Sequence, residues 1–167
     1  HLYVDLKEKA AAEVGIRFEK HVLPEVTKQA EVLELLERLN NDEKIHGILV
    51  QLPLPKHLDT NKIINAMNPD KDVDGFHPES IRKLIEKKSE FVPGLAEAIM
   101  DMINSTDVDL KNKRAVIVAN SEIFSRPIEF LLEESGAEVS VVRRNDKELG
   151  KKTRLADILV GAVGQPG

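Results

Sequence analysis

Near the start of the chain, Tyr3 and Lys7 stand four residues apart. The apolar spacing of residues 2–14 predicts a helix, on which these two side chains lie one turn apart on the same face. A phenol beside an ammonium group can hold it in place and tune its acidity, which makes a proton-transfer group for acid/base chemistry. The other interpretation is an ordinary solvated lysine on an amphipathic helix.

Two further polar residues stand where a binding site would need them. Gln51 follows the apolar run 47–50 and precedes Leu-Pro-Leu-Pro55, whose prolines end a strand and hold its exit rigid. Asp74 belongs to the segment 70–75, where three aspartates fall within five residues, and such charge usually lies in a binding loop. An amide and a carboxylate can together hydrogen-bond a planar heterocycle that carries amino and ring N–H groups. A capped strand end and a polar turn are the alternative.

The acidic segment also matches the opening of a calcium-binding EF-hand loop, because its aspartates occupy loop positions 1, 3 and 5 and Gly75 occupies position 6. Position 12 of such a loop holds a bidentate glutamate, and here it is Ile81. His77 has no partner at a metal-ligand spacing, so we interpret it as a structural loop residue. We therefore expect no metal site.

Composition limits the class of protein and its partners. A net charge of −5 and an aromatic content of 4% argue against a nucleic-acid partner, which requires basic patches and stacking rings. The apolar runs fall far below the roughly 20 residues of a membrane-spanning helix, so we expect no membrane partner. The chain has no cysteine, which excludes disulfides and thiolate catalysis and is typical of a cytoplasmic protein.

Helical and strand patterns alternate through the first part of the chain. We expect helices at 2–14 and 26–39, strands at 16–23 and 45–52, and a short helix that begins after an N-cap at Asp59 or Thr60. This alternation favours an α/β fold with a mainly parallel sheet covered by helices.

A second alternation follows the break at Pro93-Gly94 and an expected helix at 95–103, which could bridge two lobes. We expect a helix at 121–135 and strands at 114–119, 138–142 and 156–163. These elements form half of a doubly wound nucleotide-binding unit. The prediction is thus an α/β protein of two lobes: an N-terminal catalytic lobe, residues 1–92, and an incomplete Rossmann-like lobe with a parallel sheet, residues 93–167.

Four motifs, in this order and spacing, resemble the bifunctional methylenetetrahydrofolate dehydrogenase/methenyltetrahydrofolate cyclohydrolase family. They are Tyr3-x-x-x-Lys7, Leu39-Asn-Asn-Asp42, Gly47-Ile-Leu-Val-Gln-Leu-Pro-Leu-Pro55 and Lys71-Asp-Val-Asp-Gly-Phe76. The resemblance covers nearly the whole chain. Members of that family begin earlier and continue further, so the resemblance implies a chain truncated at both ends.

The resemblance implies a role for each candidate residue of the first lobe. Lys7 matches the catalytic lysine, Tyr3 its partner tyrosine and Gln51 the glutamine that tunes and positions the lysine. Asp74 matches the residue that binds the pterin ring of the folate substrate. The implied reactions convert 5,10-methylenetetrahydrofolate to the 5,10-methenyl form by hydride transfer to NADP, and hydrolyse that form to 10-formyltetrahydrofolate. A homodimer is also implied.

The predicted cofactor turn departs from the family pattern Gly-Arg-Ser-x-x-Val-Gly-x-Pro. At residues 119–127 this chain reads Ala-Asn-Ser-Glu-Ile-Phe-Ser-Arg-Pro, so both glycines and the arginine are replaced. Ala119 and Ser125 would crowd a pyrophosphate that glycines allow to approach, and Glu122 adds a negative charge near its phosphates. Asn120 and Ser121 stand at the cofactor-binding positions of this turn.

Arg143 and Arg144 stand at the end of the next expected strand, where the family usually carries His-Ser. Doubly wound folds bind the adenosine ribose at this place, so the two arginines would bind a 2′-phosphate and favour NADP over NAD. A pair of exposed basic residues is the alternative interpretation.

Three other hypotheses remain beside the bifunctional enzyme. One is a cyclohydrolase with weak or lost dehydrogenase activity, because the lysine constellation is complete and the cofactor turn is altered. Another is a non-catalytic relative that binds a folate or serves as an interaction partner, against which the presence of Lys7 argues. The last is a fragment that functions only with its missing ends.

Overall fold

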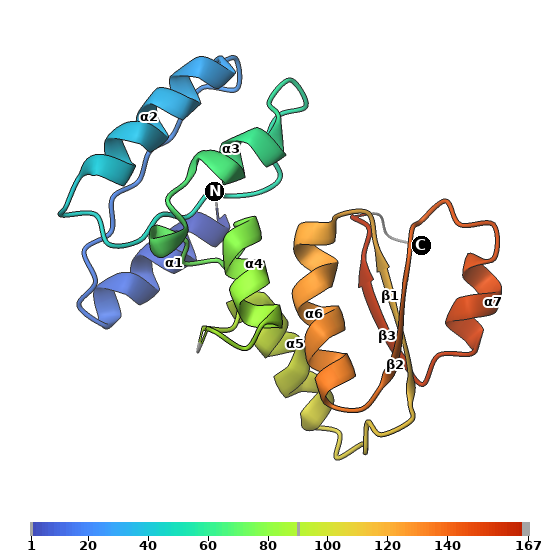
Figure 1. Ribbon diagram of the computed structural model, residues 1–167. Coiled ribbons are helices and arrows are strands. Elements are labelled where there is room, and N and C mark those ends of the chain that lie inside the picture. Colours follow the sequence, from blue (N-terminus) through green and yellow to red (C-terminus); the bar gives the residue numbers. More distant parts are fainter. Residues whose placement is uncertain (1, 90, 165–167) are drawn as a thin grey trace. The chain divides into compact units, whose positions relative to one another are not determined.

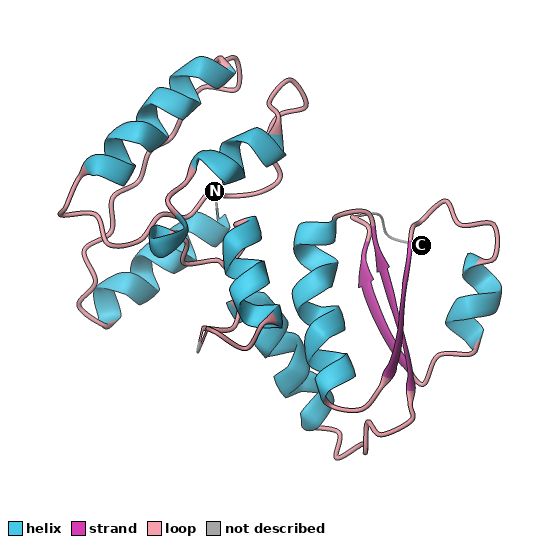
Figure 2. Cartoon of the chain, viewed as in Figure 1, coloured by secondary structure: helices cyan, strands magenta, loops and turns pink. Residues whose placement is uncertain are grey.

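The computed structural model describes residues 2–89 and 91–164, which form two compact units that divide after Met67 (Figures 1 and 2). The first unit contains the helices α1 (Leu2–Glu13), α2 (Gln29–Asn41) and α3 (Thr60–Ala66). The second contains η1 (Pro69–Lys71), α4 (Pro78–Ile85), α5 (Gly94–Asn104), β1 (Arg114–Ala119), α6 (Glu122–Glu134), β2 (Glu138–Val142), α7 (Leu149–Arg154) and β3 (Ile158–Ala162).

A small apolar core holds α2 and α3 together in the first unit. Val32 and Leu36, one turn apart on α2, pack with Ile63 and Met67 from the region of α3. The Asp59 side chain caps α3 by accepting a hydrogen bond from the Lys62 backbone N–H at 3.0 Å, as the sequence predicts. This core also contains Ile48 from the loop between the two helices, which carries the candidate residue Gln51.

The two strands expected in the first unit do not form ladders. Residues 16–24 are loop, and within 45–52 only Ile48 takes part in a strand-type bridge. Ile16 and Val22 are largely exposed, so the alternating pattern there does not mark a buried sheet face. The prediction of strands at 16–23 and 45–52 was therefore wrong. Alternation predicts an extended backbone, but a strand also requires a neighbouring strand for its hydrogen bonds.

The second unit is built on a parallel three-stranded sheet of order β2-β1-β3. Ala115, Ile117 and Ala119 face α5 and α6 in one apolar cluster, while Val116 and Val118 face the side of α7 in another. Figure 1 accordingly shows α5 and α6 on one side of the strands and α7 on the other. Burial of β1 on both faces is the arrangement of a doubly wound sheet, as predicted.

The predicted and observed elements of this sheet agree closely. The strands at 114–119 and 138–142 have the predicted bounds, and β3 is slightly shorter than the predicted 156–163. The helices α4 and α7 were missed, and both are short. The helix expected at 95–103 is α5; it belongs to the second unit and packs against α6.

The two compact units divide at a different place from the two predicted lobes. Residues 68–92 lie in the second unit, where the side chains of Lys87 and Glu134 form an ion pair between the end of α4 and α6. The acidic segment 70–75 and its candidate Asp74 are therefore in the same compact unit as the three-stranded sheet.

Candidate functional site

Tyr3 and Lys7 both lie on α1, as the sequence predicts. They are separated by about 40° around the helix axis, and thus share one face. The Tyr3 side chain is exposed and Lys7 is half-buried. The phenol and the ammonium group are therefore presented from neighbouring turns of one helix, which is the arrangement that the acid/base hypothesis requires.

The opposite face of α1 is fastened to the loop that follows it. Lys20 Nζ donates hydrogen bonds to Glu8 Oε2 at 2.8 Å and to Asp5 Oδ1 at 3.0 Å. These two bonds raise the pKa of Lys20 above its usual value. Asp5 and Glu8 project from the side of the helix away from Tyr3 and Lys7, so this bridge restrains the helix without using the candidate face.

Gln51 lies in the exposed loop that precedes α3. Its Nε2 donates to the carbonyl oxygen of Leu52 at 3.0 Å. The same loop is tied to the start of α2, because His57 Nε2 lies 3.0 Å from the Thr27 carbonyl oxygen and the Asp59 N–H donates to Gln29 Oε1 at 2.8 Å. These bonds tie the last part of this loop to the start of α2 within the first unit.

The acidic segment is shaped by Asp72, whose side chain is buried. Asp72 Oδ1 accepts from the Gly75 N–H at 3.0 Å, and Oδ2 accepts from the His77 N–H at 2.8 Å. Asp74, the predicted pterin-binding residue, is half-buried within the turn that these bonds close. The role of Asp72 was missed, although Asp followed by Gly three residues later is a recognised turn signal.

Two further residues complete this turn. Gly75 has φ of +71°, and a Cβ added there would lie 2.6 Å from Pro93 Cγ. His77 caps α4 through its Nδ1, which accepts from the Glu79 N–H at 3.0 Å, so the structural interpretation of this histidine is confirmed. Among the described residues no group of three His, Asp or Glu side chains is arranged to hold a metal ion.

A pocket of about 480 Å³ opens where β1 passes into α6. Asn120 and Ser121 line it from the turn, and Arg143 lines it from the end of β2. Arg144 is not among the lining residues; its backbone N–H lies 3.4 Å from Asn120 Oδ1. The structure thus brings three of the four predicted cofactor residues around one pocket and places the fourth beside it.

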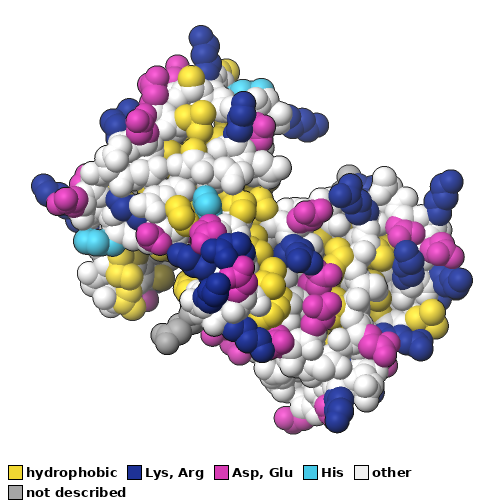
Figure 3. Space-filling view, in the orientation of Figure 1, with side chains coloured by type: hydrophobic (Ala, Val, Ile, Leu, Met, Phe, Trp, Pro, Cys, Tyr) yellow, Lys and Arg dark blue, Asp and Glu magenta, His cyan; other side chains and the backbone are white. Residues whose placement is uncertain are grey.

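The same pocket contains charges of both signs. Glu122 and Glu129 line it together with Arg126, and Arg126 Nη1 donates to Glu129 Oε2 at 2.9 Å. Positive and negative side chains are also interspersed over the face of the molecule in Figure 3. Sequence reasoning missed the Arg126–Glu129 pair, although its spacing of three residues on a predicted helix is a signal for such pairs.

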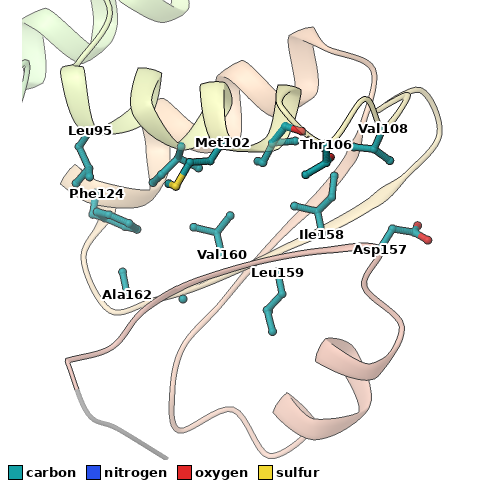
Figure 4. Close-up of a pocket in the computed structure, with 13 residues that line it drawn as sticks. Leu95, Met102, Thr106, Val108, Phe124, Asp157, Ile158, Leu159, Val160 and Ala162 are labelled. Atoms are coloured by element: carbon teal, nitrogen blue, oxygen red, sulfur yellow. Dashed lines mark hydrogen bonds between the residues drawn. The ribbon is translucent and has the colours of Figure 1, made fainter.

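An apolar groove of about 610 Å³ lies elsewhere in the second unit, between α5 and β3 (Figure 4). Leu95, Met102 and Phe124 line it from the helices. Ile158 and Val160 line it from β3 and point toward the helices in Figure 4, while Leu159 points away. The groove offers apolar packing and few polar groups, so it suits a hydrophobic neighbour better than the phosphates of a nucleotide.

Comparison with known proteins gives matches over both parts of the chain. The family model "Tetrahydrofolate dehydrogenase/cyclohydrolase, catalytic domain" matches residues 1–74, and its "NAD(P)-binding domain" matches residues 93–167. The bifunctional protein FolD of Geotalea daltonii is 42% identical over 165 residues, which are 99% of this chain and 59% of the relative. FolD of Staphylococcus haemolyticus is 44% identical over 99% of this chain and 58% of the relative.

Solved structures agree with these matches. FolD of Campylobacter jejuni superposes with a TM-score of 0.84 at 40% identity, covering 98% of this chain and 58% of that protein. FolD of Trypanosoma brucei, solved with NADP and an inhibitor, gives a TM-score of 0.88 at 35% identity, covering 99% of this chain and 57% of that protein. The chain therefore spans less than three fifths of the length of these relatives. No helix among the described residues is both long and apolar enough to cross a membrane.

Proposed function

This chain belongs to the tetrahydrofolate dehydrogenase/cyclohydrolase family, and from that membership we propose that it interconverts 5,10-methylene-, 5,10-methenyl- and 10-formyltetrahydrofolate. The reactions are an NADP-dependent dehydrogenation and a cyclohydrolysis within one-carbon metabolism. The observation that carries the proposal is that both family models match this chain while Tyr3 and Lys7 share one face of α1.

Lys7 is the proposed proton-transfer residue of the cyclohydrolase step. Water attacks the methenyl carbon, and opening of the ring then requires a proton to move between the attacking oxygen and a ring nitrogen, which a positioned amine serves. Tyr3 holds the lysine from the neighbouring turn, and Gln51 positions it from the loop before α3. The support for these roles is the shared helix face, the attachment of the Gln51 loop to α2 at His57 and Asp59, and the match of each residue to the family motifs.

Asp74 is the proposed ligand of the pterin ring. A carboxylate accepts two hydrogen bonds side by side, which fits the amino and ring N–H groups of a pterin. The support is that Asp72 and Gly75 hold the Asp74 turn in a defined shape, so the carboxylate is presented from a fixed backbone.

The second unit is the proposed NADP-binding part, with Asn120, Ser121, Arg143 and Arg144 as its contacts. The pocket at the β1–α6 turn fits a dinucleotide in two respects: it opens at the start of a helix of 13 residues, and Arg143 stands where the adenosine ribose is read. When bound, the oxidised cofactor supplies the hydride acceptor of the dehydrogenase reaction. The predicted functional boundary after residue 92 is part of the same proposal, supported by the start of the NAD(P)-binding match at residue 93.

The experiment that tests this function follows both activities of the purified chain. We expect the absorbance of 5,10-methenyltetrahydrofolate to decay faster than its spontaneous rate, and 5,10-methylenetetrahydrofolate to reduce NADP. Absence of both activities in folded protein would contradict the proposal. Hydrolysis without NADP reduction would instead favour a cyclohydrolase that has lost its dehydrogenase activity, a hypothesis to which Ala119, Ser125 and Glu122 at the pocket give a physical reason.

Cofactor preference gives a second expected result. At equal concentrations NADP should raise the Tm of the chain more than NAD, because only NADP carries a 2′-phosphate for the arginines at the end of β2. Differential scanning fluorimetry with each nucleotide measures this difference. Equal shifts, or a larger shift with NAD, would contradict the assignment of Arg143 and Arg144.

We also propose that the protein acts as a homodimer in the cytoplasm, in contact with its folate substrate and with neither nucleic acid nor membrane. Support for self-association is the apolar groove between α5 and β3, where Leu95 and Met102 are at least half exposed. Sedimentation velocity should give twice the mass of 18.7 kDa for this chain. A species with the mass of one chain at protein concentrations up to about 100 μM would contradict the dimer, because stable homodimers have dissociation constants well below that concentration.

A further inference from the structure

We propose that Arg126 is a second contact for the adenosine 2′-phosphate, and that the charge of Glu129 weakens that contact and so limits the preference for NADP over NAD. This inference rests on the proposed nucleotide function of the second unit. It adds a binding residue and a selectivity residue that the predicted set of cofactor contacts does not contain.

The first step is that two guanidinium groups from different elements line one pocket. Arg126 lies in the second turn of α6, and Arg143 directly follows β2. In doubly wound folds the adenosine ribose is bound at the carboxyl end of the second strand, which is where Arg143 stands. A phosphate on that ribose would therefore lie in the same pocket as Arg126, and an arginine can bind it with two parallel N–H groups.

The second step concerns how Arg126 is held. Its Nη1 donates to Glu129 Oε2 at 2.9 Å, and the side chain of Arg126 is 52% exposed, whereas that of Glu129 is 20% exposed. One carboxylate bond leaves the other N–H groups of the guanidinium able to turn toward the pocket. Because the Arg126 side of this pair is open to solvent, its attraction to Glu129 is weakened, so a phosphate can share the guanidinium with Glu129 at small cost.

The third step is the balance of charge. Arg126 and Arg143 are matched in the pocket lining by Glu122 and Glu129, so the lining carries no net formal charge. A 2′-phosphate is close to a dianion and is repelled by a neighbouring carboxylate, whereas the ribose hydroxyl of NAD is neutral. Glu129 therefore acts against NADP more than against NAD.

Two variants separate the contact from the charge. Arg126→Gln removes the guanidinium, and Glu129→Gln keeps an oxygen acceptor for Arg126 while removing the negative charge. Glu133→Gln is the matched control, because Glu133 lies one turn further along α6, is exposed and does not line the pocket. The probes are adenosine 2′,5′-bisphosphate and 5′-AMP, which differ only in the 2′-phosphate, and affinities are measured by titration calorimetry.

Arg126→Gln should weaken binding of the bisphosphate about tenfold and change binding of 5′-AMP by less than about twofold. Glu129→Gln should strengthen binding of the bisphosphate about three- to tenfold, with Glu133→Gln unchanged. Arg126→Lys keeps the positive charge and should lose only part of the affinity for the bisphosphate. This milder variant is the control for a folding defect in Arg126→Gln.

Equal losses for both probes in Arg126→Gln would overturn the 2′-phosphate contact, and an effect of Glu129→Gln no larger than that of Glu133→Gln would overturn the role of Glu129. NADP binding by the unmodified chain is measured in the same series. If the unmodified chain binds NADP but the variants give these contradicting results, the inference fails and the proposed function stands. If the unmodified chain does not bind NADP, both fail.

Discussion

Replacement of Lys7 by methionine is expected to slow the hydrolysis of 5,10-methenyltetrahydrofolate by about 10²- to 10⁴-fold, the range that positioned acid/base groups contribute. Methionine keeps the length and apolar stem of lysine but cannot carry a proton. Because methionine forms helices about as well as lysine, α1 should remain in place and the loss of rate should arise from chemistry. The decay of substrate absorbance, corrected for the spontaneous rate, measures the effect.

Lys9→Met is the matched control for this experiment. Lys9 lies on the same helix, is exposed and forms a weak surface pair with Glu13 at 3.9 Å, so its replacement should leave the rate within about twofold of the original. A Lys7→Met protein that hydrolyses the substrate as fast as Lys9→Met would remove Lys7 from the mechanism. Circular dichroism of both variants shows whether α1 is intact.

Gly75→Ala is expected to lower the free energy of unfolding by roughly 2–5 kcal/mol. One part of the loss is the φ of +71°, which an L-residue adopts only at a cost of about 1–2 kcal/mol. The other part is steric, because the new Cβ would lie 2.6 Å from Pro93 Cγ and Pro93 is buried and cannot move aside freely. Urea titration followed by circular dichroism measures the change.

Gly15→Ala separates the two parts of that loss. Gly15 has a similar φ of +77°, but nothing lies within 4 Å of the position of an added Cβ. This variant should therefore lose only the backbone part, about 1–2 kcal/mol. If the two alanine variants lost the same free energy of unfolding, the close approach of Gly75 and Pro93 would contribute nothing to the effect of Gly75→Ala.

The sheet of the second unit could be predicted almost to the residue because two independent signals coincide there. The run 115–119 is apolar throughout, since this part of β1 is buried on both faces, and a helix of the right length separates it from the next strand. The segment 16–23 carries only one signal, alternation, and this describes an extended chain equally well whether or not another strand lies beside it. Pairing depends on contacts distant in sequence, which periodicity does not report.

The candidate residues also differ in whether local geometry or the folded structure determines their arrangement. Tyr3 and Lys7 could be placed together because helix geometry alone relates them. Asp72 and Asp74 look equivalent in the sequence, and only the folded turn shows that Asp72 is buried and bound to the backbone while Asp74 is half-buried. The pocket at Asn120, Ser121 and Arg143 follows from the topology of a doubly wound sheet, whereas its internal Arg126–Glu129 pair requires side-chain positions.

The backbone bonds of Asp72 have a consequence for the affinity of the proposed pterin site at Asp74. A loop that becomes ordered only when its ligand arrives loses conformational entropy in the binding step, and the measured affinity falls by that amount. Here Asp72 has already ordered the segment through the N–H groups of Gly75 and His77. The entropy of this segment is lost during folding, so Asp72 would contribute to the affinity of the proposed Asp74 site without touching the substrate.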